Sequence, residues 1–223
     1  MPIAAKLTVI ALIFSFFSCK KSDSGNTTPA ESYMSFSSGS TWQFRQTDNS
    51  TGTSTNYMLT STNRDTSINS KTYHIFTNSN GNSSQYLGVS GNDYYEFRSL
   101  LNSLSGNMVE LLYLKSAAAT GFSWSQSQTL NVSGLSVPVT VTYKIAETGG
   151  TRTINGTNYT NVVKVTASIS SALVPPTGLI TDIQNYYAPR VGIIESNYKI
   201  DIDFSGIIQQ IDTKTILLSS AIL

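Results

Sequence analysis

The sequence contains very few of the residues from which catalytic and metal sites are built. Its 223 residues include one cysteine, Cys19, and one histidine, His74. A single cysteine excludes an intrachain disulfide and a zinc site made of cysteines. A single histidine excludes a metal site made of imidazole rings. His74 stands in the segment KTYHIF, which is typical of a strand, so we interpret it as an ordinary strand residue and expect no catalytic residues and no metal.

Charged residues are also scarce. Lys, Arg, Asp and Glu make up 12% of the chain, and the formal net charge is +1. Such a chain presents no strong field to nucleic acid, so we expect no nucleic-acid partner. The glycines of TGGTR, residues 148–152, lack the lysine and the following helix of a phosphate-binding loop, and they indicate a hairpin turn instead. We therefore expect no cofactor.

Two carboxylates could still support hydrolysis or calcium binding. Asp201 and Asp203 would lie about 7 Å apart on one strand face, which suits a glycosidase pair and, with nearby asparagines, a calcium site. They alternate regularly with hydrophobic residues, however, and solvated surface acids are far more common in such positions. We expect a protein that is not an enzyme, and a hydrolase is the least favoured function.

Long hydrophobic runs are absent except at the N-terminus. Residues 1–19 read MPIAAKLTVIALIFSFFSC, with a positive charge at Lys6, a short apolar stretch and then Ser18-Cys19. The pattern resembles a bacterial lipoprotein signal peptide, although Phe16 stands where leucine is usual. The resemblance implies that residues 1–18 are removed and that Cys19 receives the lipid.

A lipidated Cys19 implies a stable attachment to the outer membrane. Each buried methylene of its acyl chains would contribute about 0.8 kcal/mol, and Lys20 and Lys21 would attract anionic head groups. Residues 22–32 are small, polar and interrupted by Pro29, so residues 19–32 are predicted to be the lipidated cysteine and a flexible tether reaching about 20 Å. The sequence leaves the periplasmic and the cell-surface side open.

The remainder, residues 33–223, has the pattern of antiparallel strands. Residues 137–145, 162–169 and 198–204 alternate between hydrophobic and polar side chains. Asn155-Gly156 stands between two such runs and predicts a hairpin, and residues 93–115 also favour a hairpin over a helix. The sequence therefore predicts an all-β domain with antiparallel sheets, built as an open barrel or a two-sheet sandwich.

One order of motifs occurs twice. Gly-Trp, Ile-Asn with a tyrosine five positions after the isoleucine, Tyr-Tyr and a hairpin follow one another in residues 33–116 and again in residues 117–223. This order indicates two similar halves. Chance similarity within a β-rich sequence is the alternative.

The second half also resembles a family pattern. GFSW, INGTNYTNVVKV and YYAPRVGIIES, spread over residues 121–200, together with the start SCKKSD, resemble uncharacterised lipoproteins of the Bacteroidetes type. Arg190 stands where glycine is more common in that pattern. The resemblance implies an antiparallel sheet or open barrel and transfers no catalytic residue.

Aromatic residues are the remaining candidates for ligand contact. In each Tyr-Tyr pair one ring must face the core and the other must face outward, and we select Tyr95 and Tyr187 as candidate ligand contacts. We expect an envelope lipoprotein that binds a hydrophobic ligand or an envelope partner. The alternative is a surface module that binds glycan or protein. The sequence leaves the oligomeric state open.

Overall fold

The computed structural model describes residues 32–81, 84–100, 108–132, 135–204 and 206–223. The chain divides into two units, Met1–Ala30 and Glu31–Leu223, and every described residue belongs to the second, which we call the β domain. The predicted signal peptide, Cys19 and the predicted tether up to residue 31 lie outside the described residues.

The described part of the β domain consists almost entirely of strands, as the alternating sequence predicts. One turn of 3-10 helix, η1 (Pro176–Gly178), lies at the two adjacent prolines. The hairpin predicted for residues 93–115 is confirmed, with its turn outside the described residues. The twelve strands are β1 (Thr41–Asp48), β2 (Ser54–Ile68), β3 (Lys71–Asn78), β4 (Ser84–Ser90), β5 (Asp93–Ser99), β6 (Met108–Lys115), β7 (Ser123–Val132), β8 (Leu135–Ile154), β9 (Thr157–Ser170), β10 (Leu179–Ala188), β11 (Gly192–Phe204) and β12 (Ile207–Ala221).

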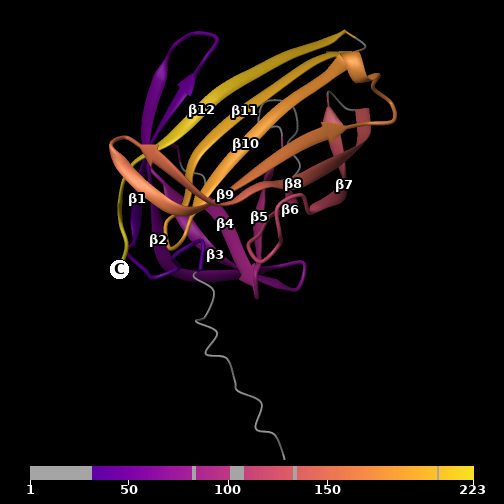
Figure 1. Ribbon diagram of the computed structural model, residues 1–223. Helices are drawn as coiled ribbons and strands as arrows, with labels where there is room; N and C mark the ends of the chain where they lie inside the picture. Colours follow the sequence, from indigo (N-terminus) through magenta and orange to yellow (C-terminus); the bar gives the residue numbers. More distant parts are fainter. Residues whose placement is uncertain (1–31, 82–83, 101–107, 133–134, 205) are drawn as a thin grey trace, which may run out of the picture. The chain divides into compact units, whose positions relative to one another are not determined.

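All twelve strands form one antiparallel sheet in the order β6-β5-β4-β3-β2-β1-β12-β11-β10-β9-β8-β7. Except for β6 and β7, which form the two edges, strands that are consecutive in the chain are neighbours in the sheet, and the first strand, β1, also pairs with the last, β12. The sheet curls into a nearly closed barrel (Figure 1), so of the two predicted architectures the open barrel is correct. The predicted halves each hold a six-stranded meander, β1–β6 and β7–β12, whereas a duplication between them stays a prediction.

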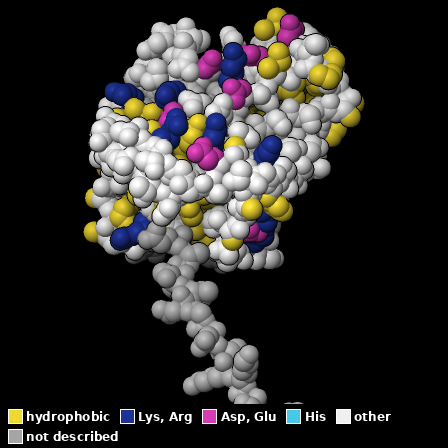
Figure 2. Space-filling model, in the orientation of Figure 1, with side chains coloured by type: hydrophobic (Ala, Val, Ile, Leu, Met, Phe, Trp, Pro, Cys, Tyr) yellow, Lys and Arg dark blue, Asp and Glu magenta, His cyan; other side chains and the backbone are white. Residues whose placement is uncertain are grey.

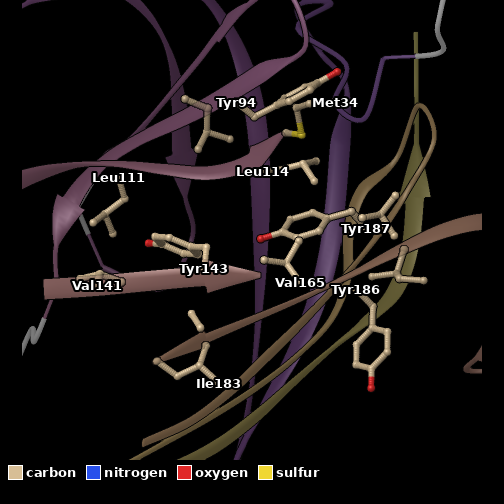
Figure 3. Close-up of a cluster of buried hydrophobic side chains, with 14 of the residues drawn as sticks. Met34, Tyr94, Leu111, Leu114, Val141, Tyr143, Val165, Ile183, Tyr186 and Tyr187 are labelled. Carbon is tan, nitrogen blue, oxygen red and sulfur yellow. The ribbon is translucent and has the colours of Figure 1, made fainter. Parts of the chain in front are cut away.

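The inward face of the sheet carries the hydrophobic core. Successive side chains of a strand point to opposite faces, so the Tyr-Tyr pairs are split: Tyr94 is buried inside. Figure 3 shows the rings of Tyr186 and Tyr187 pointing in different directions, Tyr187 toward Tyr143 and Val165, although both rings are buried. Fully buried side chains of this size contribute about 1.5–3 kcal/mol each. The largest in this core are Trp42, Phe76, Leu111, Leu114, Leu130, Ile145, Ile194, Ile200 and Leu217.

The segment before β1 packs against the core at the end of the barrel that holds the β10–β11 turn. Met34 is buried in the core, and the backbone N–H of Arg190 donates to the Ser32 carbonyl at 2.5 Å. Gly192 begins β11 directly beneath Met34. A Cβ atom there would lie 2.8 Å from the Met34 sulfur, and the φ angle of +88° also favours glycine.

The two predicted turns around the β8–β9 hairpin have different outcomes. Asn155-Gly156 forms the turn, with φ angles of 47° and 80°, as predicted. The predicted turn at residues 148–152 is wrong, because these residues continue β8. There the register between β8 and β9 shifts three times between Ile145 and Arg152, and Gly149 has a φ angle of +70°. Turns and bulges both use glycines with positive φ, so this short sequence did not distinguish them.

The two edge strands, β6 and β7, meet through side chains instead of a backbone ladder. Trp124 Nε1 donates to the Leu112 carbonyl at 2.8 Å, and Gln128 Nε2 donates to the Glu110 carbonyl at 2.9 Å. In the other direction, the Leu112 N–H donates to Gln126 Oε1 at 2.7 Å. These alternate side chains of β7 satisfy the backbone groups that an edge strand would otherwise leave free. We call this contact the β6–β7 seam.

Most of the surface seen in Figure 2 belongs to the backbone and to side chains that are neither hydrophobic nor charged. This agrees with the low charge of the chain and with the polar positions that alternate along its strands. Within the described part of the chain, no helix has the length and apolarity required to cross a membrane.

We predict that the substitution Gln126→Leu weakens the β6–β7 seam. Leucine leaves the Leu112 N–H without its acceptor, which should lower the free energy of unfolding by about 1 kcal/mol. Urea denaturation followed by tryptophan fluorescence measures this change. Ser127→Leu, on the adjacent exposed position of the same strand, is the control and should change stability by no more than about 0.5 kcal/mol. Equal stability of the two variants would contradict the role of the seam.

Candidate functional site

A group of aromatic side chains lies on the outward face of β3, β4 and β5. Strand register places Tyr86 beside Phe97, while Tyr95 follows on the same face of β5, opposite Gly88. Tyr73 lies on the corresponding face of β3, opposite to that of His74. None of the four aromatic residues belongs to the interior cluster. We call Tyr73, Tyr86, Tyr95 and Phe97 the outer aromatic strip.

Phe97 and Gly88 bring the rings of the strip together. The Phe97 ring centroid lies 6.2 Å from that of Tyr73 and 6.5 Å from that of Tyr86. Gly88 makes room for the Tyr73 ring, because a Cβ atom on Gly88 would lie 3.4 Å from its Cδ1 and 3.0 Å from the Thr72 carbonyl oxygen. Tyr73 is thereby fully buried, while Tyr86, Tyr95 and Phe97 remain half-buried and reach the surface.

An ion pair borders the strip. Lys71 Nζ lies 2.5 Å from Glu110 Oε1 on β6, and the Tyr73 hydroxyl donates to Glu110 Oε2. Burial by itself would raise the pKa of Glu110, but the hydrogen bonds from Lys71 and Tyr73 and the charge of Lys71 outweigh it, so the pKa lies below its ordinary value. Burial is also the main reason why the pKa of Tyr73 is raised, followed by its bond to Glu110. At neutral pH the strip therefore adjoins a carboxylate and an ammonium group.

The two tyrosines selected from the sequence have different surroundings. Tyr95 belongs to the strip, and Lys71 Nζ lies 3.9 Å from its ring centroid. Tyr187 is 4% exposed and stacks on Tyr113 inside the barrel, with 5.6 Å between ring centroids. Burial raises the pKa of Tyr187 well above its ordinary value. Contact of either tyrosine with a ligand stays a prediction, and for Tyr187 the ligand would have to enter the barrel.

A small apolar pocket lies at the barrel end opposite the β10–β11 turn. Its walls come from the inward faces of β7–β9 and β11 and include Leu130, Val139, Ile169, Ile200 and Phe204. Its volume is about 50 Å³. One water molecule takes up about 30 Å³ of liquid, and sites for drug-sized ligands span about 300–1,000 Å³. As described, this pocket has room for a short apolar group.

The one histidine has hydrogen-bond partners in the order found in serine hydrolases. His74 Nε2 lies 2.9 Å from Ser61 Oγ, and His74 Nδ1 lies 2.6 Å from Asp65 Oδ1. The bend of β2 creates this arrangement, because the register with β3 shifts between Ser61 and Asp65. The sequence contained no local signal for it.

Ser61 is less accessible to a substrate than the nucleophile of a serine hydrolase has to be. Ser61 is 1% exposed, and its hydroxyl also lies within hydrogen-bonding distance of the Phe36 carbonyl, at 3.2 Å. The Phe36 ring packs edge-on against the His74 ring, with 5.6 Å between centroids. The Ser61 N–H donates to the Ser40 carbonyl, so it is not free to stabilise an oxyanion. In this conformation Ser61 and His74 contact Phe36 and hold the segment before β1 against the barrel.

Asp201 and Asp203 share one face of β11 with Lys199, as the alternation predicts. Lys199 Nζ lies 3.8 Å from a carboxylate oxygen of Asp201 and 4.0 Å from one of Asp212 on β12. Among the described residues, no group of three or more His, Cys, Asp or Glu side chains is arranged to hold a metal ion.

Comparisons with known proteins identify similar folds. No family model and no curated protein matches the chain. A crystal structure of a "putative lipoprotein" from Parabacteroides distasonis matches with a TM-score of 0.51 and 12% identity, over 86% of this chain and 99% of that chain. A "putative exported protein" with a YmcC-like fold from Bacteroides fragilis matches with a TM-score of 0.47 and 12% identity, over 82% and 96% of the two chains. At this identity, the first likeness shows a common fold alone.

We predict that Ser61 does not react with a fluorophosphonate probe in the native protein, because its hydroxyl is buried beneath Phe36. Ser61→Ala should instead lower the free energy of unfolding by about 1 kcal/mol through the loss of its hydrogen bonds. Ser67→Ala, at an exposed position of the same strand, is the control and should leave stability unchanged. Native labelling that disappears in Ser61→Ala would reveal a working nucleophile and contradict this prediction.

Proposed function

We propose that the chain is an envelope lipoprotein, anchored in the outer membrane through Cys19, whose β domain binds carbohydrate without catalysing a reaction. The observation that carries the binding role is the outer aromatic strip. It combines aromatic rings at the surface with a charged hydrogen-bonding pair on one outward sheet face.

The chemistry of the strip is suited to a sugar. A pyranose has apolar ring faces that stack on aromatic rings and hydroxyl groups that need donors and acceptors at the edge. The rings of Tyr86, Tyr95 and Phe97 supply the apolar contact. Lys71, whose side chain is 44% exposed, supplies a donor, and Glu110 supplies an acceptor. The strip thus offers both parts of such a contact.

Other ligand classes fit the strip less well. A stable protein interface buries about 800 Å² on each partner around a broad apolar centre. Three half-buried rings beside an ion pair make a smaller and more polar surface than that. A hydrophobic ligand would require a pocket in place of a sheet face.

A carrier of a hydrophobic ligand is the second candidate. The apolar pocket of about 50 Å³ favours it. Three exposed hydrophobic side chains at the same end of the barrel, those of Leu173, Ile180 and Ile208, increase the apolar surface there. The volume fits an apolar group of a ligand and not a whole lipid. We therefore place this candidate after carbohydrate binding.

The sequence of residues 1–19 supports the anchor. The description of the Parabacteroides distasonis neighbour as a putative lipoprotein is consistent with it. Ser32, the first described residue, binds the β10–β11 turn through its carbonyl. The predicted tether would therefore join the β domain at that end of the barrel. We propose binding without catalysis because the candidate nucleophile, Ser61, is buried.

We predict that Tyr95→Ala and Phe97→Ala each weaken carbohydrate binding by about tenfold, because each removes one stacking ring. Retention on insoluble polysaccharides identifies a ligand, and titration calorimetry with oligosaccharides from it measures the affinity. Phe122→Ala, which removes an exposed aromatic ring just before β7, is the control and should bind as the wild type does. Failure to retain any polysaccharide, or unchanged affinity in both strip variants, would contradict the proposal.

We predict that the wild-type protein partitions into the detergent phase of a Triton X-114 extract and that Cys19→Ser moves it to the aqueous phase. The acyl chains on Cys19 are the physical cause, since each buried methylene contributes about 0.8 kcal/mol. Labelling with a palmitate analogue in the producing cell should disappear in the same variant. Wild-type protein that stays aqueous and unlabelled would refute the anchor and leave the binding role of the strip to be judged by its own test.

A further inference from the structure

A second outward surface, remote in sequence from the aromatic strip, is covered by the end of the β8–β9 hairpin. β8 and β9 run for 20 and 14 residues, and the register shifts between Ile145 and Arg152 bend their shared end. The bent end lies against β12, where Asn155 Nδ2 donates to the Leu218 carbonyl at 3.0 Å. Figure 1 shows this hairpin extending to the side of the sheet where β1 and β12 lie. We call residues 147–162 the β8–β9 arm.

A pocket of about 440 Å³ lies between the arm and the outward faces of β1, β11 and β12. The strand register explains its composition, because Arg45 of β1 pairs with Ile216 of β12, which in turn pairs with Glu195 of β11. Its charged and polar lining consists of Arg45, Thr47, Arg152, Thr153, Asn155, Glu195 and Lys214. Three of these side chains are positive and one is negative.

The one carboxylate in the lining is already saturated with donors. Glu195 is 2% exposed, and Arg152 Nε donates to its Oε2 at 2.5 Å. Lys214 Nζ lies 3.1 Å from its Oε1. Burial would raise the pKa of Glu195, but the bonds and charges of Arg152 and Lys214 outweigh it and hold the pKa below its ordinary value. Glu195 therefore stays ionised at neutral pH and organises two cations around itself.

Positive charge remains in excess after this pairing. Arg45 is exposed and forms no ion pair with any carboxylate of the described residues. Arg152 lies 3.5 Å from the ring centroid of Tyr186, measured from its Cζ, so the ring fixes the guanidinium while Glu195 occupies its Nε. Among the described residues, no hydrogen-bond partner engages its two terminal amino groups, which can therefore donate to a ligand. Glu147, at the base of the arm, also acts on Arg152 electrostatically, but it is not part of the lining.

We propose that this pocket binds an oxyanion group, that is, a carboxylate, sulfate or phosphate carried by a small molecule or by an acidic sugar. Arginine side chains bind such groups through paired N–H donors, and charge-assisted bonds of this kind are about twice as strong as neutral ones. Arg45 on β1 and Arg152 on the arm approach the pocket from two elements, and Lys214 adds a third positive charge. The site is independent of the outer aromatic strip, since none of its lining residues belongs to β3–β6.

The test is titration calorimetry of the detergent-solubilised full chain with sodium sulfate and with sodium glucuronate, at an ionic strength kept constant with sodium chloride. Glucose is the neutral counterpart of glucuronate. We expect at least one of the two anions to bind and glucose not to bind at this pocket. Binding of sulfate indicates that the anionic group alone suffices, whereas binding of glucuronate alone indicates an acidic sugar.

Arg45→Gln is the diagnostic variant, because Arg45 is exposed and holds no other described charge in place. We expect it to weaken anion binding by about tenfold. Arg64→Gln, which removes an exposed arginine from β2 outside the pocket, is the matched control and should bind within about twofold of the wild type. Lack of binding by both anions, unchanged anion affinity in Arg45→Gln, or glucose binding that Arg45→Gln weakens to the same extent would overturn the proposal, whereas glucose bound at the outer aromatic strip should be unaffected by Arg45→Gln.

Discussion

The pairing of the first strand with the last determines where the other features of the β domain lie. Because β1 pairs with both β2 and β12, the first and last strands meet inside the sheet, and the two sheet edges fall at β6 and β7, which are consecutive in the chain. Unpaired edges are sites of unwanted association, and here side chains of β7 satisfy backbone groups of β6. The same pairing places Arg45 next to β12. The cationic pocket therefore exists only because residues from opposite ends of the chain are neighbours in the sheet.

The inward face of the sheet is largely occupied by packing, which leaves the outward face for binding. The described apolar pocket measures about 50 Å³, whereas the pocket under the β8–β9 arm measures about 440 Å³. Both proposed binding surfaces use positions that alternate with core residues: Tyr95 follows the buried Tyr94, and Glu195 follows the buried Ile194. Period-two alternation thus lets one strand serve the core and a surface site at once.

Much of the fold could be predicted because its determinants are local. Alternation identified the strands around residues 137–145, 162–169 and 198–204, and Asn155-Gly156 identified the β8–β9 turn. The unusual residue in the family-like segment also has a local explanation. Arg190 has a φ angle of 66°, a conformation that glycine adopts without strain, so the structure of this turn would also suit a glycine there. Tyr95 was selected because one of two adjacent tyrosines must point outward, but the same rule did not tell which of Tyr186 and Tyr187 does so. A bulge between those two residues shifts the register with β11.

The candidate sites could not be predicted to the same extent because they depend on contacts between distant residues. Arg152 and Glu195 are 43 positions apart, and only the bend of β8 at its bulges brings them together. Read alone, each is one charged residue in a polar strand position. The pair becomes informative only when burial is known, because the Glu195 carboxylate is 2% exposed. A buried carboxylate is tolerated only when charged partners surround it. Arg152 and Lys214 supply that compensation for Glu195, so the additional charge of Arg45 has no structural task in the described part of the chain. In a sequence with 12% charged residues, such an excess at one pocket is better explained by a ligand than by folding.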